Sequence, residues 1–280
     1  MNKRAIALFF ILFIPAPSPA GLHDPFPMGH SMTHFGTVVR HRGIGGRQPW
    51  NPSCFYHDSL RFGLSTATAW YYDPMDNLKE TSINQLILGG FYDYSFVTVK
   101  ASFAHLSALD LYFEQTGFLS LGTDALKYVL ISFELCGYHI GLSHEDESEK
   151  MLYAGESFWI PWKLVGLSVT RKNIRLDGAS EPGFRPPTLW QIGIHTKKTQ
   201  AGALGVLIEL TEEKNPEFRL YIGEEYWFHN NFALGIGIAT RPFMISAGFA
   251  VNIVSANAYA SMVNHPVLGW SKGFGIEWSK

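Results

Sequence analysis

The sequence is poor in charge, and this excludes several classes of partner. Lys and Arg together number 22 against 24 Asp and Glu, and charged residues make up only 16% of the 280-residue chain. An average soluble domain holds about 25%. The net charge of −2 gives no long-range field that would steer nucleic acid or another polyanion toward the chain. We therefore expect no nucleic-acid partner.

Cysteine and catalytic motifs are also scarce. Cys54 falls in a loop-like stretch and Cys136 at a predicted strand end or turn. Both fit an oxidising compartment, but spacing alone cannot place their Cα atoms close enough for a disulfide, so a disulfide and two free thiols both stay open. The sequence contains no nucleotide-binding loop, Cys-x-x-Cys, Gly-x-Ser-x-Gly or His-Glu-x-x-His motif. We therefore predict no enzymatic activity and no catalytic residue.

Long apolar runs are missing after residue 20. Residues 1–20 are typical of a secretory signal, with basic Lys3 and Arg4, an apolar stretch at 5–14, and small residues before a cleavage point after Ala20. An uncleaved anchor is the alternative, although a transmembrane helix needs ~20 apolar residues. A closed β-barrel can cross a membrane without any such run, because it satisfies its backbone hydrogen bonds internally.

Alternation with a period of two dominates the sequence from residue 59 onward, in segments of about ten residues. Apolar residues alternate with small or polar ones at 97–103, 165–170, 190–195, 204–210, 232–239 and 243–249. Charged residues are rare on the second face, which favours the lumen of a barrel over the wet face of a soluble sandwich. At 138–143 the same reading turns Tyr138, Ile140 and Leu142 to lipid, and His139 and Gly141 to the lumen.

The breaks between segments carry turn residues, and aromatic residues cluster at the predicted strand ends, as in the interfacial girdles of membrane barrels. Packing at the edge of a soluble core is the alternative reading of these aromatics. The stretch 107–131 is poorly patterned, and 125–135 fits either a strand or a helix. We predict an all-β, antiparallel transmembrane barrel of about 12–14 strands. Its expected parts are a signal peptide at 1–20, an irregular and plug-like segment at 21–58, and the barrel at 59–280.

The end of the chain carries the sharpest local motif. Residues 271–278 resemble the C-terminal assembly signal of bacterial outer-membrane barrels, with Gly273, Ile276 and Trp278 at its Gly, hydrophobic and aromatic positions. The sequence departs from that signal because Ser279 and Lys280 follow the aromatic residue. The resemblance implies recognition by the outer-membrane assembly machinery.

Two further stretches resemble one branch of these barrels. Residues 51–53 (Asn-Pro-Ser) resemble the Asn-Pro-Ala element of the FadL-like superfamily of long-chain fatty-acid transporters. Residues 258–260 (Tyr-Ala type) and 265–271 (His-Pro-x-Leu-Gly type) are similar to the end of PorV-type barrels. The resemblance implies fourteen strands and an N-terminal hatch.

Several polar residues fall on or near the predicted inner face, and they either line a path or neutralise one another in a packed interior. They are Arg61, Lys100, His139, His195, Glu209, Arg219, Glu225 and Glu277.

The N-terminal histidines suggest a separate hypothesis. After cleavage the chain would begin Gly21-Leu22-His23, an arrangement of nitrogen ligands that suits Cu(II) or Ni(II), and His30 and His34 follow beside Met28 and Met32. The alternative is a polar segment whose histidines bind nothing. Apart from this copper site, we expect no cofactor.

These observations together predict a protein of the bacterial outer membrane, surrounded by membrane lipid. As a FadL/PorV-type barrel it would pass small hydrophobic molecules, or act as an accessory for exported proteins. A structural or copper-related barrel is the alternative.

Overall fold

The computed structural model describes the chain as antiparallel strands and their nearest flanking residues. The described residues are 62–71, 83–94, 97–108, 112–126, 129–142, 148–162, 165–176, 187–196, 202–212, 216–229, 231–241, 243–253, 256–265 and 269–279. The proposed signal peptide and the segment 21–58 lie outside them. Within these ranges, no helix is long and apolar enough to span a membrane.

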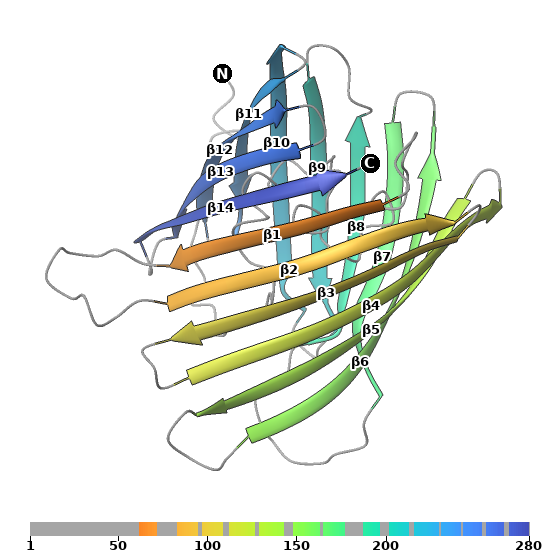
Figure 1. The fold of residues 1–280 in the computed structure, drawn as a ribbon. Helices are drawn as coiled ribbons and strands as arrows, with labels where there is room; N and C mark the ends of the chain where they lie inside the picture. Colours follow the sequence, from red (N-terminus) through yellow and green to blue (C-terminus); the bar gives the residue numbers. More distant parts are fainter. Residues whose placement is uncertain are drawn as a thin grey trace, which may run out of the picture.

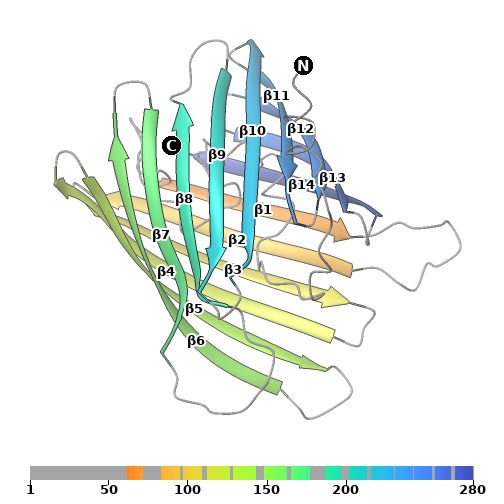
Figure 2. The ribbon, with the colours of Figure 1, turned by 180° about the vertical axis from the view of Figure 1, so that it is seen from behind.

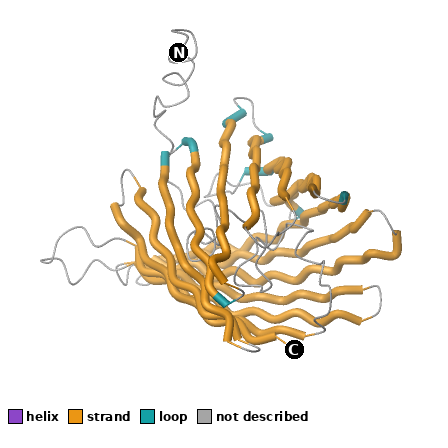
Figure 3. The backbone as a smooth tube through the Cα atoms, turned by 90° about the horizontal axis from the view of Figure 1, so that it is seen from above, coloured by secondary structure: helices purple, strands orange, loops and turns teal. Residues whose placement is uncertain are grey.

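Fourteen strands form one closed barrel in which each strand pairs with its neighbours in sequence (Figure 1). In chain order they are β1 (Phe62–Tyr71), β2 (Ile83–Tyr94), β3 (Val97–Ala108), β4 (Tyr112–Leu126), β5 (Val129–Leu142), β6 (Ser148–Pro161), β7 (Val165–Arg175), β8 (Leu189–Thr196), β9 (Gly202–Thr211), β10 (Phe218–His229), β11 (Phe232–Ala239), β12 (Met244–Ile253), β13 (Ala256–His265) and β14 (Gly269–Ser279). The last strand closes the ring on the first, with Ala67 opposite Gly275. Figure 3 shows the wall from above. The predicted all-β, antiparallel barrel is confirmed.

The two rims of the barrel differ in the length of their connections. At one rim the strands are joined by residues 95–96, 127–128, 162–164, 197–201, 230–231 and 254–255, and β1 begins and β14 ends there. At the other rim the longer connections include 72–82 and 176–188. We call these the short-turn rim and the long-loop rim. Outer-membrane barrels keep short turns on the periplasmic side and long loops outside.

The alternating pattern in the sequence arises because side chains in each strand point in turn to the interior and to the outside. In β11, Phe232, Leu234, Ile236 and Ile238 are exposed on the outer face, whereas Ala233, Gly237 and Ala239 are buried. The outer face is apolar over most of the ring. Its exposed residues include Leu88, Phe103, Leu121, Phe133, Leu152, Phe158, Ile192, Leu204, Ile222, Ile245, Phe249, Phe274 and Ile276. Such a belt fits lipid and would aggregate in water.

On β10 an acid interrupts this apolar belt. Glu224 is exposed in the middle of β10, where its register neighbours are Leu204 and Ile236. Tyr226 and Phe228 follow on the same face, with their rings edge to face at 4.6 Å. Glu224 therefore lies on the outside of the barrel.

The predicted faces of residues 138–143 are wrong. Tyr138 and Ile140 are buried in the wall of β5, while His139 between them lies on the outer face. The His139 ring contacts Gln115 of β4, with 3.3 Å between Nδ1 and Oε1. The assignment failed because the inner face of β5 is apolar at this end of the strand, so hydrophobicity does not distinguish the two sides there.

The poorly patterned stretch 107–131 contains no helix among its described residues. It contains the end of β3, all of β4 and the start of β5. The two long strands β4 and β5 pair from Tyr112 opposite Leu142 to Leu126 opposite Val129. Cys136 lies in the middle of β5 and not at a strand end or turn, and it is a buried free thiol. Cys54 lies outside the described residues.

Candidate functional site

The inner wall of the barrel carries an apolar cluster. Six of its residues come from three adjacent strands, namely Phe118 of β4, Cys136, Tyr138 and Ile140 of β5, and Met151 and Tyr153 of β6. The rings of Tyr138 and Tyr153 meet edge to face with centroids 5.3 Å apart, and the Tyr153 hydroxyl lies 3.3 Å from the sulfur of Met151. Aromatic and thioether groups of this kind bind apolar molecules with little dependence on shape.

The same cluster includes small residues from a distant part of the wall. Ala233 of β11 and Ala250 of β12 belong to it. Ala104 of β3, which lies next to β4, completes the cluster. In the barrel order β11 and β12 lie on the far side from β5 and β6, as Figure 1 shows. Apolar surface therefore joins two opposite sectors of the interior.

A row of polar residues crosses the inner wall beside this cluster. In register from β5 to β10, it consists of Ser132, Ser157, Thr170, Gln191, Glu209 and Arg219. Figure 2 shows β7 to β10 side by side in this part of the wall. The row begins near the short-turn rim, where β5 starts, and ends near the long-loop rim, where β10 starts. It therefore runs obliquely from one mouth of the barrel toward the other.

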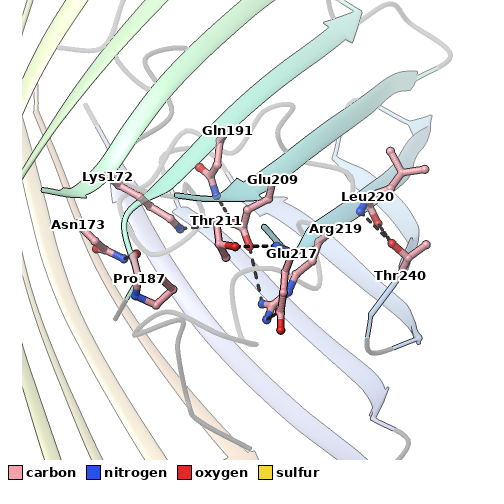
Figure 4. Close-up of polar contacts among 10 residues, drawn as sticks. All are labelled: Lys172, Asn173, Pro187, Gln191, Glu209, Thr211, Glu217, Arg219, Leu220 and Thr240. Carbon is pink, nitrogen blue, oxygen red and sulfur yellow. Dashed lines mark hydrogen bonds and ion pairs between the residues drawn. The ribbon is translucent and has the colours of Figure 1, made fainter. Parts of the chain in front are cut away.

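The charged end of this row is built around Glu209 (Figure 4). Gln191 donates a hydrogen bond of 2.6 Å to Oε2 of Glu209. The Lys172 ammonium lies 3.8 Å from the same oxygen, and Arg219 lies 3.7 Å from Oε1. Only 3% of the Lys172 side chain and 5% of the Glu209 side chain are exposed. Because charges buried this deeply need opposite charges beside them, the cluster holds its members in place.

A backbone distortion lies next to this cluster. Asn173 of β7 has a positive φ of 58°, and the pairing of β6 with β7 shifts register between Ala154 and Glu156. The Asn173 side chain donates to the carbonyl of Pro187, and the Thr188 hydroxyl donates to the carbonyl of Asn173. These two hydrogen bonds hold the irregular segment at Asn173 against residues 187–188, which lead into β8. Asparagine tolerates the left-handed conformation better than most residues.

A second ion pair lies on the outer face at the long-loop rim, and its side chains are more exposed than those of Lys172 and Glu209. Arg171 of β7 makes a bidentate contact with Glu212, with distances of 2.9 and 3.1 Å from its Nη2. Its guanidinium also lies 5.4 Å from the centre of the Trp190 ring. Cationic and aromatic groups in this arrangement are typical of the boundary between lipid and water.

The residues that were predicted to face the lumen do not share one location. Arg219 lies on the inner wall beside Glu209 and also contacts Glu217 at 3.2 Å. His139 is on the outer face, as described above, and does not join them. Lys100, His195 and Glu225 belong to β3, β8 and β10, but their side chains are outside the described set, as is the whole of Arg61.

Lys172 and Gln191 were not among the predicted site residues. The sequence signal was present, since both continue the inner-face alternation of residues 166–170 and 189–193. The histidines of the copper hypothesis, His23, His30 and His34, lie outside the described residues. Within the described ranges, no group of three or more His, Cys, Asp or Glu residues is arranged to hold a metal ion.

Comparison with solved structures finds the same architecture in bacterial outer-membrane proteins. The Pseudomonas putida toluene transporter TodX matches with a TM-score of 0.63 at 8% identity, over 90% of this chain and 97% of TodX. The CymD monoaromatic hydrocarbon channel matches with a TM-score of 0.62 at 7% identity, over 82% and 91%. Omp33 of Acinetobacter baumannii matches with a TM-score of 0.53 at 9% identity, over 79% and 98%.

The chain is an outer-membrane β-barrel. Its closed ring of strands, its apolar outer face and the architecture that it shares with these proteins all agree with this location. No protein-family model matches the sequence, and no curated protein sequence matches it. At identities below 10% the structural likeness concerns the fold, so the function has to be argued from the inner wall.

Proposed function

We propose that this barrel is a FadL-like channel that passes small hydrophobic molecules across the outer membrane. The observation that carries the proposal is the apolar cluster on the inner wall, formed by Phe118, Tyr138, Ile140, Met151 and Tyr153. A water-filled porin has a polar interior. A wall of aromatic, aliphatic and thioether groups instead favours an apolar solute, because binding removes apolar surface from water.

The structural neighbours support the same class of solute. TodX is a toluene transporter and CymD a monoaromatic hydrocarbon channel. Both share the barrel with this chain, and a monoaromatic hydrocarbon is of a size that a few aromatic side chains can surround. We therefore take small aromatic hydrocarbons as the first solutes to test. The plug-like role of residues 21–58 belongs to the same proposal, since a solute path needs a segment that can move aside.

The experiment compares uptake of a labelled monoaromatic hydrocarbon with uptake of a hydrophilic solute of similar mass. Cells that produce the barrel are compared with cells of the same strain that lack it. We expect the barrel to accelerate hydrocarbon uptake and to leave entry of the hydrophilic solute unchanged. Acceleration of the hydrophilic solute alone would indicate a general pore. Unchanged uptake of both would instead favour the accessory role.

A pair of variants at Met151 tests the wall itself. Met151→Glu places a carboxylate against Tyr153 in the apolar cluster, whereas Met151→Leu keeps a similar volume and polarity. We expect hydrocarbon uptake to fall sharply in the first variant and to persist in the second. The heat-modifiable fraction on gels, which reports the folded barrel, serves as the control for assembly.

A further inference from the structure

A row of polar residues crosses the outer face of the barrel near the long-loop rim. His105, Gln115, His139 and Lys150 are register neighbours on β3, β4, β5 and β6, strands that lie side by side in Figure 1. Each residue lies two or three positions from the end of its strand at this rim. The row therefore marks the edge of the apolar belt that is nearer the long-loop rim, where the lipid headgroups begin.

The row is rich in hydrogen-bond donors and holds no carboxylate. The amide of Gln115 contacts His139 at 3.3 Å, and the ring of Phe113 packs edge to face on the same imidazole at 5.1 Å. Lys150 is exposed and has no ion-pair partner among the described residues. Nδ1 of His105 is buried and lacks a hydrogen-bond partner within the same set. The Lys150 ammonium is therefore the group of this row that is available to a ligand outside the barrel.

A notch in the apolar belt lies directly beneath the row. Gly117 and Gly137 are register neighbours on β4 and β5, and a Cβ added to either would meet nothing within 4 Å. Exposed apolar side chains surround the pair: Phe103 and Leu152 on the adjacent strands, and Leu119 and Leu135 one step further along β4 and β5. The outer wall is thus recessed next to its polar edge.

We propose that this surface binds a membrane lipid that carries an anionic phosphate headgroup. The phosphate oxygens would accept hydrogen bonds from the exposed Lys150 ammonium beside His139, because donors with a positive charge make the strongest contacts to phosphate. The acyl chain would enter the notch at Gly117 and Gly137. We choose a lipid as the occupant because this face of the barrel is turned to the bilayer. We choose an anionic one because the exposed Lys150 gives the row a positive charge.

The experiment measures lipid retention by the full-length protein with native mass spectrometry. Protein purified in a neutral detergent is titrated with phosphatidylglycerol or with phosphatidylcholine. The buffer contains a chelator, so that no divalent cation links lipid phosphate to carboxylates of the protein. We expect phosphatidylglycerol to be retained more strongly, and the Lys150→Gln/His139→Leu variant to bind it about tenfold more weakly.

Two further variants separate this site from general attraction between charges. Arg241→Gln removes a cation from an exposed turn outside the row, so it should leave retention unchanged. Gly137→Leu places a side chain in the notch, where an added Cβ meets no atom within 4 Å, so it should weaken retention while the folded fraction stays constant. Equal retention of the two lipids by the unaltered protein would overturn the proposal. Equal losses in Lys150→Gln/His139→Leu and Arg241→Gln would overturn it as well, as would a dimer that excludes lipid.

Discussion

Glu209 and Glu212 are acids three residues apart that meet opposite surroundings. Glu209 is buried on the inner wall, where Lys172 and Arg219 both approach its carboxylate. Glu212 is exposed on the outer side and pairs with Arg171, whose side chain is 31% exposed. Breaking a buried pair leaves uncompensated charge in a place that water does not reach, whereas an exposed pair loses little because solvent replaces the partner.

We therefore expect Glu209→Ala to lower the free energy of unfolding by about 3 kcal/mol and Glu212→Ala by less than about 1 kcal/mol. Urea unfolding of the barrel in detergent micelles, followed by tryptophan fluorescence, measures both. The two variants remove the same atoms, so each is the control for the other. Equal losses would mean that water reaches Glu209 freely and that the inner cluster does not hold the wall.

For a single residue, the sequence predicts the strand to which it belongs better than it predicts the face of the barrel wall on which its side chain lies. Glu224 and Glu225 are adjacent acids of β10, and one of the two must point outward because successive side chains alternate. Glu225 was the residue predicted to face the lumen, and Glu224 does lie on the outer face. The same reasoning failed for His139, because Tyr138 and Ile140 were taken for lipid-facing residues and in fact belong to the inner wall.

The strands differ in how clearly the sequence reveals them, for a physical reason. In β11 the inner face is small, with Ala233, Gly237 and Ala239, so the alternation is clear and the strand was predicted correctly. In β4 and β5 the inner face mixes apolar Phe118 and Ile140 with polar Ser120 and Glu134, and the outer face also carries both kinds of residue. When each face is mixed, the period of two is weak, which explains why this hairpin remained ambiguous between strand and helix.

The outer face of a strand should tolerate charge according to depth. Ile236 lies in the middle of β11 with 61% of its surface exposed, and Ile253 is the last residue of β12, with 63% exposed at the short-turn rim. An arginine on the lipid face costs about 2–4 kcal/mol at the bilayer midplane and about 0–1 kcal/mol near the interface. Ile236→Arg should therefore impair assembly far more than Ile253→Arg.

The folded fraction of each variant in isolated outer membranes, read from heat modification on gels, measures this difference. Ile236→Leu provides the control at the same position, because it keeps an apolar side chain of equal size. If the two arginine variants assembled equally well, the outer face of β11 would not be in contact with hydrocarbon.

For the whole molecule, the sequence predicts a range for the number of strands, and the structure gives the number within that range. The segment count predicted 12–14 strands, and the described residues form fourteen. The number could not be fixed from the sequence because β4 and β5 lacked a clear period. The polar row on the inner wall was also beyond prediction, since its members come from six strands and meet only through the register of the closed sheet.

The closing strand decides whether this barrel forms at all. β14 pairs with β13 on one side and with β1 on the other, so the first and last described strands meet only when the chain is complete. Trp278 lies opposite Leu64 of β1 and Ala256 of β13, and 40% of its surface is exposed on the outer face. It occupies the aromatic position of the predicted assembly signal, together with Gly273 and Ile276.

If these three residues form that signal, Trp278→Ala should lower the amount of folded barrel in the membrane chiefly by blocking insertion. The strand must be recognised before it can pair with β1. If Trp278 only anchors the finished barrel at the interface, the variant would insert normally and melt at a lower temperature, because aromatic rings stabilise that boundary. The heat-modifiable fraction and the melting temperature, measured on the same membranes, separate the two. Trp278→Phe is the control, since it keeps an aromatic ring at the position. Normal insertion with unchanged melting in Trp278→Ala would contradict both roles and leave closure to the backbone pairing alone.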